Sequence, residues 1–364
     1  TNDGQTIFLL GELVQTKMMV YSENNTILIN HKDYLNNIYN NVTENGIDET
    51  ASFRVSPKLF CIVTENNCKK NLKRKHDYDN FDKETKMLKE ELTNFVASIP
   101  EDIKNEMLTW DIADASTIRD FAKMTFESAN FDHMGISGNN NSVNSLKCVI
   151  KDEMFLIPPF CSFICGDVAE GCRKLKEDDT FNILIADPPW WNKFIRRVRA
   201  ANNKLSYSMM YNEDIASIPV QPLLSENSLV AIWCTNAPSH IKAVKELIFP
   251  KWGIEYRTTW FWIKVKTNLE PICEFSGGSK KQPYERIIIG SKGIVVEISN
   301  RVIISVPSAL HSHKPPLINL LKPYIEADNP KTVELFSRYL LPHTTSIGFE
   351  PLKWQHISLY ESIT

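Results

Sequence analysis

The feature that most constrains the fold is a change of pattern after residue 150, where short apolar runs alternate with short helical segments. Seven runs rich in β-branched and aromatic residues predict buried strands at Ser162–Cys165, Ile183–Ala186, Leu229–Trp233, Thr258–Ile263, Arg286–Ile289, Val302–Val306 and Val333–Phe336. Helical signals lie between them at Asn212–Ser217, Ser239–Leu247 and Pro316–Tyr324. This alternation predicts an α/β sheet with helices on both faces, whose ligands bind at the carboxyl ends of the strands.

Length and charge limit the number of domains and the ways in which the chain can bind nucleic acid. Its 364 residues are long enough for two domains, at about 150 residues each. A net charge of −3, from 41 basic and 44 acidic residues, excludes a uniformly basic mode of nucleic-acid binding, so any such affinity is local. With 43% hydrophobic and 23% charged residues, we expect a packed fold and no extensive disorder.

The first part of the chain shows little chemistry. We expect strands near Ile27–Ile29 and Leu59–Val63, and helices over Lys83–Leu108 that are interrupted at Pro100 and serve for packing. The run Lys69–Lys75 holds five cations and no anion, which is typical either of a nuclear import signal or of a solvated basic face. An asparagine-rich stretch at 135–145 predicts a boundary, with an N-terminal accessory α+β region over 1–145 and a larger domain over 146–364.

Membrane insertion and secretion are not expected. No apolar run approaches the roughly 18 residues that span a bilayer, and Thr1–Leu10 lacks the features of a signal peptide. The sequence begins without methionine, so we expect it to be a piece of a longer protein. Eight scattered cysteines favour reduced thiols inside the cell. The spacing of Cys161, Cys165 and Cys172 matches no zinc motif, and we expect no metal.

The sharpest signal is Asp187-Pro188-Pro189-Trp190, directly after the apolar run Ile183–Ala186. Two prolines fix φ and remove two backbone donors, so the nearby carbonyls can point into a cleft beside the Asp187 carboxylate. Such acceptors suit an exocyclic amine, and the Trp190 ring can stack on the base that carries it. The set fits a flipped adenine; the alternative is a rigid turn with a packed tryptophan.

A basic loop follows this tetrapeptide. Between Trp190 and Tyr207 the cations have no acid among them, and they are Lys193, Arg196, Arg197, Arg199 and Lys204. In a net acidic protein, such a cluster beside a base pocket favours contact with nucleic-acid phosphates, and Tyr207 adds a stacking surface. The alternative is a solvated basic surface.

Two further polar segments are expected at the same edge of the sheet. Ser312–Pro315 follows the run Val302–Val306, and Glu334–Arg338 overlaps the end of another run. Lys314 and Arg338 can bind a ligand's carboxylate and hydroxyl groups there, or they are ordinary surface charges. The sequence has no GxGxxG, GxxxxGK[ST], serine-elbow or HExxH motif, so the nicotinamide, P-loop and common hydrolase interpretations lose their support.

Together these segments resemble the MT-A family of S-adenosylmethionine-dependent adenine N6-methyltransferases, over roughly Cys161–Ser358. Lys69–His76 and the ending Gly348–His356 look closest to the methyltransferase-like protein 4 branch of that family. The resemblance implies a Rossmann-like methyltransferase sheet, S-adenosyl-L-methionine as cofactor and no metal. It implies small nuclear RNA (U2 snRNA, at a 2′-O-methyladenosine) as the substrate, and nuclear and also cytoplasmic location. Activity as a monomer and activity in a heterodimer both stay open.

The resemblance also implies roles for single residues. The catalytic segment is Asp187, Pro188, Pro189 and Trp190, and Asp187 touches both the cofactor and the substrate amine. The implied cofactor-binding residues are Asp167, Val168, Asp187, Lys314, Phe336, Arg338 and Glu350. The implied substrate-binding residues are Trp190, Arg196, Arg197, Arg199, Tyr207 and Glu285. Where the family often has glycine then asparagine, this chain has Gly348-Phe349, which leaves the ribose contact open.

In such an enzyme, positioning does most of the catalytic work, because the adenine amine is a weak nucleophile. Acceptors at Asp187 and the Pro188 carbonyl orient its two N–H groups and direct the lone pair at the sulfonium methyl. Two alternatives remain: a DNA adenine methyltransferase, and a non-catalytic RNA-binding subunit of a methyltransferase complex. The intact tetrapeptide favours an enzyme.

Overall fold

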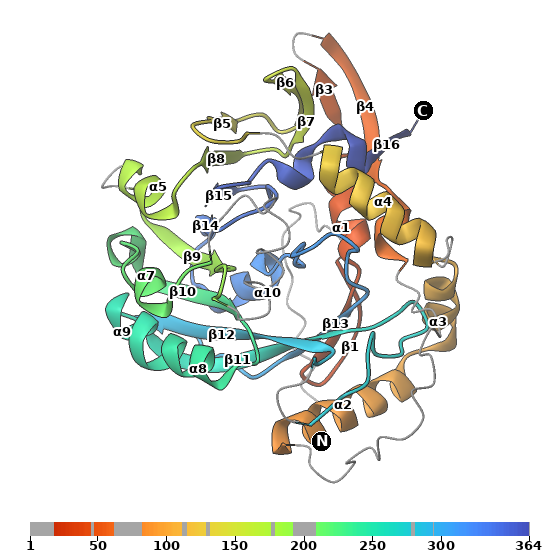
Figure 1. Cartoon of the computed structure of the whole chain (residues 1–364), viewed down its shortest axis with the longest axis vertical. Helices are drawn as coiled ribbons and strands as arrows, with labels where there is room; N and C mark the ends of the chain where they lie inside the picture. Colours follow the sequence, from red (N-terminus) through yellow and green to blue (C-terminus); the bar gives the residue numbers. More distant parts are fainter. Residues whose placement is uncertain are drawn as a thin grey trace, which may run out of the picture.

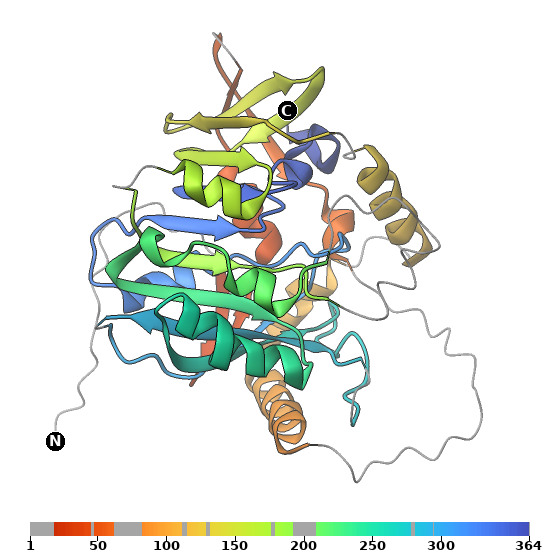
Figure 2. The same ribbon diagram turned by 60° about the vertical axis from the view of Figure 1, so that its left-hand side comes forward.

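The computed structural model describes residues 18–44, 47–61, 82–110, 115–128, 132–175, 179–191, 209–277, 281–293 and 295–363. Eleven of the described strands form one large sheet (Figures 1 and 2). In spatial order they are β1 (Met19–Glu23), β2 (Thr26–Ile29), β13 (Val302–Ser305), β11 (Glu255–Lys264), β12 (Tyr284–Lys292), β10 (Leu224–Cys234), β9 (Phe181–Ala186), β14 (Thr332–Leu335), β15 (Thr344–Gly348), β8 (Cys161–Cys165) and β5 (Ser137–Asn140).

The centre of this sheet is mostly parallel. β10, β9, β14, β15 and β8 run in one direction, as do β11, β13 and β2, and β12 is antiparallel to both of its neighbours. Parallel pairing of this kind puts the carboxyl ends of β9, β14, β15 and β8 at one edge. The start of β12 lies at the same edge, because Arg286 pairs with Cys234 at the end of β10.

A second sheet packs beside the first, at the top of Figure 1. Its strands in spatial order are β16 (Tyr360–Ile363), β4 (Ile47–Val55), β3 (Val42–Glu44), β6 (Ser145–Ile150) and β7 (Glu153–Ile157). The described helices are α1 (His31–Ile38), α2 (Lys83–Ser98), α3 (Glu101–Leu108), α4 (Ala115–Ser128), α5 (Val168–Lys174), α7 (Asn212–Ala216), α8 (Pro238–Ala243), α9 (Phe249–Lys251) and α10 (Ile318–Leu321).

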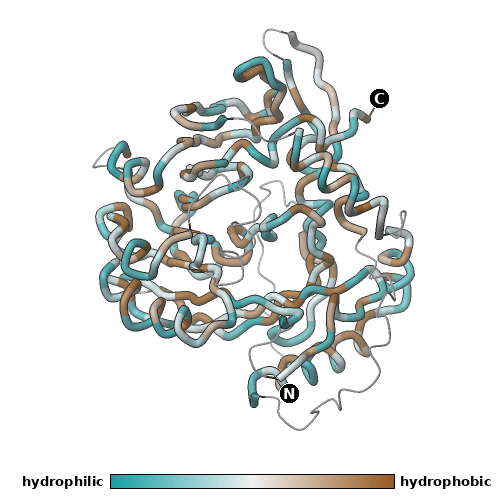
Figure 3. The backbone as a smooth tube through the Cα atoms, viewed as in Figure 1, coloured by the Kyte–Doolittle hydropathy of each residue, from teal (hydrophilic) through white to brown (hydrophobic). Residues whose placement is uncertain are grey.

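The hydrophobic core lies on both faces of the large sheet, and hydrophobic segments recur along its strands (Figure 3). Along β10 the side chains alternate: Leu229, Ala231 and Trp233 join the cluster that also includes α1 and α10, while Val230 and Ile232 join the cluster with α7 and α9. Successive side chains of a strand point to opposite faces of the sheet, and both faces are buried here. The strands are therefore continuous apolar runs in the sequence. The predicted α/β sheet with helices on both faces is therefore confirmed.

All seven strand predictions are confirmed within one or a few residues. The strand expected at Leu59–Val63 is wrong for its described part, because Leu59 and Phe60 belong to the 3₁₀ helix η1 (Pro57–Phe60) and Cys61 is not in a strand; Ile62 and Val63 lie outside the described residues. Pro57 fixes φ near the helical value, and the Leu59 N–H donates to the Ser56 carbonyl at 3.0 Å, so the chain turns here. Helices α2 and α3 are separated at Pro100, as expected.

Strands from both sides of residue 145 share the two sheets. β2 pairs with β13 in the large sheet, β5 pairs with β8, and β3 pairs with β6 in the small one. The segment 135–145, expected as a separator, contains β5. The division at residue 145 stays a prediction, but the pairing means that the first part of the chain completes the sheets of the second. Across the described ranges, no helix is both long and apolar enough to cross a membrane.

Candidate active site

Polar side chains from several strands meet at the carboxyl edge of the large sheet. Asp187 follows β9, the segment with Phe336 and Arg338 follows β14, and Lys264 is the last residue of β11. Glu285 is the second residue of β12, which starts at this edge because it is antiparallel. These side chains therefore meet at the edge where the rule for ligand binding in such sheets predicts a site.

Asp187 lies between two cations. Arg338 donates a hydrogen bond to Asp187 Oδ2 at 3.1 Å, and Lys314 Nζ lies 3.9 Å from Oδ1. The three side chains are 10 to 15% exposed, so this ion-pair arrangement is largely shielded from water. In such a setting charge-assisted hydrogen bonds fix the orientation of the carboxylate.

Glu285 also lies between two cations. Lys264 and Lys314 both donate hydrogen bonds to its carboxylate, so Lys314 links the Glu285 and Asp187 groups. Burial alone would raise the pKa of Glu285, but the Lys314 and Lys264 ammonium groups outweigh it and lower the pKa to about 2. Burial would likewise lower the pKa of Lys314, yet Asp187 and Glu285 raise it. Both partners are charged at neutral pH.

Lys314 is held by its surroundings as well as by charge. Its ammonium lies over the ring of Trp233, 5.1 Å from the centroid, and over Trp262 at 5.9 Å. The Tyr339 hydroxyl donates to the Lys314 carbonyl at 2.7 Å. Lys314 thus lies near Asp187, and here its ammonium pairs with protein carboxylates; its contact with a cofactor stays a prediction.

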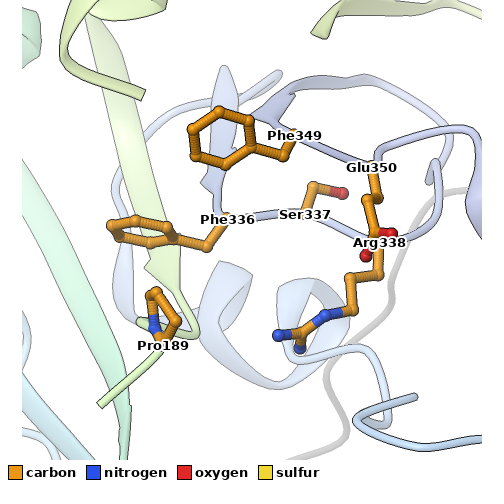
Figure 4. A pocket seen from close by; sticks show the side chains of 6 residues that line it. All are labelled: Pro189, Phe336, Ser337, Arg338, Phe349 and Glu350. Atoms are coloured by element: carbon orange, nitrogen blue, oxygen red, sulfur yellow. The ribbon is translucent and has the colours of Figure 1, made fainter. Parts of the chain in front are cut away.

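A pocket opens next to this cluster (Figure 4), and its lining residues are Pro189, Phe336, Ser337, Arg338, Phe349 and Glu350. In the view of Figure 4, the rings of Phe336, Phe349 and Pro189 lie toward one side, and Arg338 and Glu350 lie toward the other. An apolar wall opposite a few polar groups is typical of small-molecule and cofactor sites.

Backbone geometry brings the two phenylalanines together. Phe336 has φ of 61°, a left-handed conformation that costs an ordinary residue about 1–3 kcal/mol and is concentrated at functional sites. Gly348 ends β15 against this turn, where an added Cβ would lie 2.9 Å from the Ser337 carbonyl oxygen. Only glycine allows this approach.

Asp167 and Val168 lie farther along the same edge. Asp167 is exposed, caps helix α5 by accepting the Glu170 N–H at 2.9 Å, and Val168 is buried in the first turn. The Gly166 N–H donates to the Gly348 carbonyl at 2.7 Å, which ties the ends of β8 and β15. Asp167 and Asp187 thus lie at the two ends of a row formed by β8, β15, β14 and β9.

Two of the predicted residues make contacts within the protein that differ from their expected ligand contacts. Glu350 lines the pocket, but its carboxylate accepts a hydrogen bond from Lys353 at 2.6 Å, and both side chains are 5% exposed. Trp190 is 6% exposed, donates its indole N–H to the Trp233 carbonyl at 2.9 Å and stacks on His240. The packed-tryptophan alternative therefore describes Trp190 in this structure, and little of its ring is left for a base.

The proline carbonyls of the tetrapeptide are used within the protein. The Trp190 N–H donates to the Pro188 carbonyl at 2.8 Å, and the Met210 N–H donates to the Pro189 carbonyl at 2.9 Å. The expectation that the Pro188 carbonyl points freely into the cleft is corrected by this turn. The Asp187 side chain is then the main acceptor that the tetrapeptide contributes.

The structure leaves four of the predicted substrate-binding residues untested. Arg196, Arg197, Arg199 and Tyr207 lie outside the described residues, as do Lys193, Lys204 and the basic run Lys69–Lys75. Within the described ranges, no group of three His, Cys, Asp or Glu side chains is arranged to hold a metal ion, and Cys161, Cys165 and Cys172 are buried free thiols.

Sequence reasoning assigned no role to three contributors at this edge. Lys264 follows an apolar strand pattern that gives it no signal of its own, and its contact with Glu285 depends on the β11–β12 register. Glu334 has a buried carboxyl on β14. Helix α2 contacts the start of β12: Glu84 pairs with Arg286, and the Thr85 and Tyr284 hydroxyls lie 3.0 Å apart. Only the alternation of the β14 segment, which puts Glu334 among apolar residues, gave a signal in the sequence.

Comparisons with known proteins agree with this geometry. Residues 181–350 match the model of the MT-A70 family, a range that contains Asp187, Glu285, Lys314 and Arg338. This match and the sheet define the class of S-adenosylmethionine-dependent methyltransferase folds. The chain is 33% identical over 237 residues to the human "N(6)-adenine-specific methyltransferase METTL4", covering 62% of this chain and 48% of that protein. Residues 181–350 of the chain are therefore similar to the MT-A70 family.

Other relatives carry different names. The "DNA N6-methyl methyltransferase" of Caenorhabditis elegans is 36% identical over 213 residues, covering 56% of this chain and 55% of that protein. The "N6-methyladenosine RNA methyltransferase MTA1" of Cryphonectria parasitica is 32% identical over 206 residues, covering 55% and 60%. The chain spans about half the length of the curated relatives it matches.

Proposed function

We propose that this chain transfers a methyl group from S-adenosylmethionine to the N6 amine of adenosine in RNA. The observation that carries the proposal is the Asp187 carboxylate at the end of β9, fixed by Arg338 and Lys314 beside a phenylalanine-lined pocket. The match to the MT-A70 family supports the chemistry, as do the names of three relatives, all of which specify N6 methylation.

The residues at this edge fit the cofactor. The row of strand ends from Asp167 to Asp187 offers one exposed carboxylate, an apolar wall at Phe336 and Phe349, and the cations Arg338 and Lys314. Such a set suits a ligand with an aromatic base, ribose hydroxyls and an amino-acid end. When bound, the cofactor supplies a methyl group on a positively charged sulfur.

Asp187 is the residue that orients the acceptor amine. Its carboxylate accepts an N–H of the adenine amine and favours the pyramidal form, in which the lone pair is free to attack. Arg338 and Lys314 hold the carboxylate in place, so little reorganisation is needed when the amine arrives. The amine proton leaves after transfer.

The substrate is tested on oligonucleotides of one sequence made as RNA and as DNA. Mass spectrometry after incubation with S-adenosylmethionine should detect N6-methyladenosine in the RNA, with Asp187→Asn as the inactive control. Preferential methylation of the DNA would replace the RNA assignment by the DNA alternative. Cofactor binding by calorimetry with no product on either strand would favour a non-catalytic subunit.

A finer proposal concerns the RNA itself. We infer a small nuclear RNA target, U2 snRNA, with a 2′-O-methyl group on the acceptor adenosine. Its support is the similarity to METTL4 and the resemblance of the chain's ending to that branch. Matched U2 oligonucleotides with and without the 2′-O-methyl group test it, because a preference for the modified target gives a higher kcat/KM on that strand alone.

The basic loop after the tetrapeptide is proposed to bind phosphates. Reversing the charge of Arg196, Arg197 and Arg199 should weaken binding to all RNA sequences about equally and reduce the salt slope by about one unit per lost contact. Unchanged affinity with an unchanged salt dependence would make the loop a solvated surface. The nuclear location, carried by Lys69–Lys75, is tested by imaging a fluorescent fusion with and without those cations.

A further inference from the structure

Glu334 is a buried carboxyl next to Asp187 that the proposed reaction has not yet used. In the β14–β9 register Glu334 pairs with Ile185, two residues before Asp187. Side chains two apart along extended backbone point to the same face, so Asp187, directly after β9, lies diagonal to Glu334, on whose carboxyl its charge acts. The flanking Val333 and Leu335 belong to the core cluster on the opposite face.

The surroundings of Glu334 do not favour its charge. The residue is 8% exposed, and its Oε2 has no hydrogen-bond partner in the described part of the chain. Charged and titratable groups approach it from three elements: Asp187 after β9, Arg338 and Tyr339 after β14, and Tyr34 from α1. Burial and the Asp187 carboxylate raise the pKa of Glu334 to about 8, against the opposing effect of Arg338.

The groups behind Glu334 are neutral. The His313 ring lies 4.8 Å from that of Tyr339 and 4.7 Å from that of His31. Burial lowers the pKa of His313 to about 3, and burial also lowers the pKa of His31. Burial raises the pKa of Tyr34 and of Tyr339. Arg338 is therefore the cation that faces Glu334 within the described residues.

Arg338 faces two carboxyl groups, and only one of them holds it. The guanidinium bonds Asp187 at 3.1 Å, and the β14–β9 register puts Glu334 close by on the same face. A neutral Glu334 does not compete for this cation. An ionised Glu334 would be a second buried anion, which needs a partner and would repel Asp187.

We propose that Glu334 is a positioning residue for methyl transfer: as a neutral acid it leaves Arg338 bonded to Asp187, and on losing its proton it draws Arg338 away. The proposal rests on the proposed function, because Asp187 is the group that orients the acceptor amine. Below pH 8 Glu334 keeps its proton, and above pH 8 it loses it. The rate of methyl transfer is therefore expected to fall as the pH rises above 8.

Glu334→Gln tests this role, because the amide has nearly the same shape and does not ionise. The kcat of the full chain is measured from pH 6.5 to 9.5 with saturating S-adenosylmethionine and oligonucleotide. The wild-type kcat should fall on the order of tenfold by pH 9, and the kcat of the variant should lack this fall whatever its level at pH 7. Glu297→Gln, at an exposed site, is the matched control and should fall like the wild type.

A second measurement does not depend on activity. The folded protein holds the Glu334 proton up to about pH 8, whereas the unfolded chain loses it near the ordinary pKa of glutamate. Because the folded state binds more protons between these values, its stability falls as pH rises through this window. Glu334→Gln removes this loss, so the free energy of unfolding of the variant should rise relative to wild type from pH 5 to pH 8.

The outcomes separate the two proposals. The role of Glu334 is overturned if the kcat of Glu334→Gln still falls at alkaline pH, or if the wild-type kcat stays level to pH 9.5. Methyl transfer itself stands in both cases. Absence of the relative stability gain shows that Glu334 is ionised throughout and overturns this role as well. A stability gain without methyl transfer by the wild type on either nucleic acid overturns the proposed function, and with it the role assigned here.

Discussion

The site has two halves that are built in different ways. The Asp187 half uses adjacent parallel strands, β9 and β14, and its ion pair with Arg338 lies wholly within the range that matches the MT-A70 family. The Glu285 half uses the start of the antiparallel strand β12, and helix α2, outside that range, contacts this start. Asp187 is thus held by residues within that range, whereas the Glu285 half is also contacted by the first part of the chain.

The largest effect is expected from Asp187, which would confirm that this half does the chemistry. Asp187→Ala should lower the rate of methyl transfer by about 10²- to 10³-fold, because one positioned acceptor is lost. The fold should stay intact by circular dichroism, since Asp187 follows its strand and is not part of the core. Near wild-type product from the folded variant, measured by mass spectrometry, would remove Asp187 from the mechanism.

Lys314 lies between the two halves, and we expect its removal to weaken cofactor binding. Loss of a charge-assisted hydrogen bond of about 1.5–3 kcal/mol predicts cofactor binding about ten- to a hundredfold weaker in Lys314→Ala. RNA binding measured without cofactor should stay nearly unchanged. Calorimetry decides: intact cofactor affinity together with collapsed RNA affinity would place Lys314 on the nucleic-acid surface.

The smallest effect is expected at helix α2. It tests whether the two halves of the site can be changed independently. Glu84→Gln removes a partly exposed ion pair with Arg286, worth about 1 kcal/mol at most. It should raise the KM for the oligonucleotide a few-fold and leave the cofactor Kd unchanged, because the start of β12 loosens while β9 and β14 do not. Glu90→Gln, exposed on the same helix, is the control. An equal change in both constants would contradict a division into halves.

The sequence predicted most strands of the large sheet, but it did not predict which strands pair with one another. Runs such as Ile183–Ala186 are apolar on both faces, so local pattern alone identifies them as buried strands. β15 was missed because Thr344–Gly348 mixes threonine, serine and glycine, and its burial follows from neighbours on both sides. The pairing of β2 with β13 joins segments far apart in the chain, and no local pattern encodes such a contact.

The same division applies to the site. The position of Asp187 was predictable, because it follows from one strand end and one general rule. The contact between Lys264 and Glu285 was not, since it requires the β11–β12 register. Trp190 shows the opposite case: its place in the motif was clear, but its burial against His240 depends on the helix that packs on it.

The pairing of β2 with β13 also bears on how the protein is made. Thr26 pairs with Val302, and Val55 pairs with Tyr360. During synthesis, β2 and β4 therefore leave the ribosome well before the strands with which they pair. At about 5–20 residues per second, nearly 280 residues of synthesis separate the first pair by roughly 15–55 s. During that time β2 and β4 each present unpaired backbone groups, a state prone to aggregation. Expression at lower temperature or with chaperones should therefore raise the yield of soluble protein.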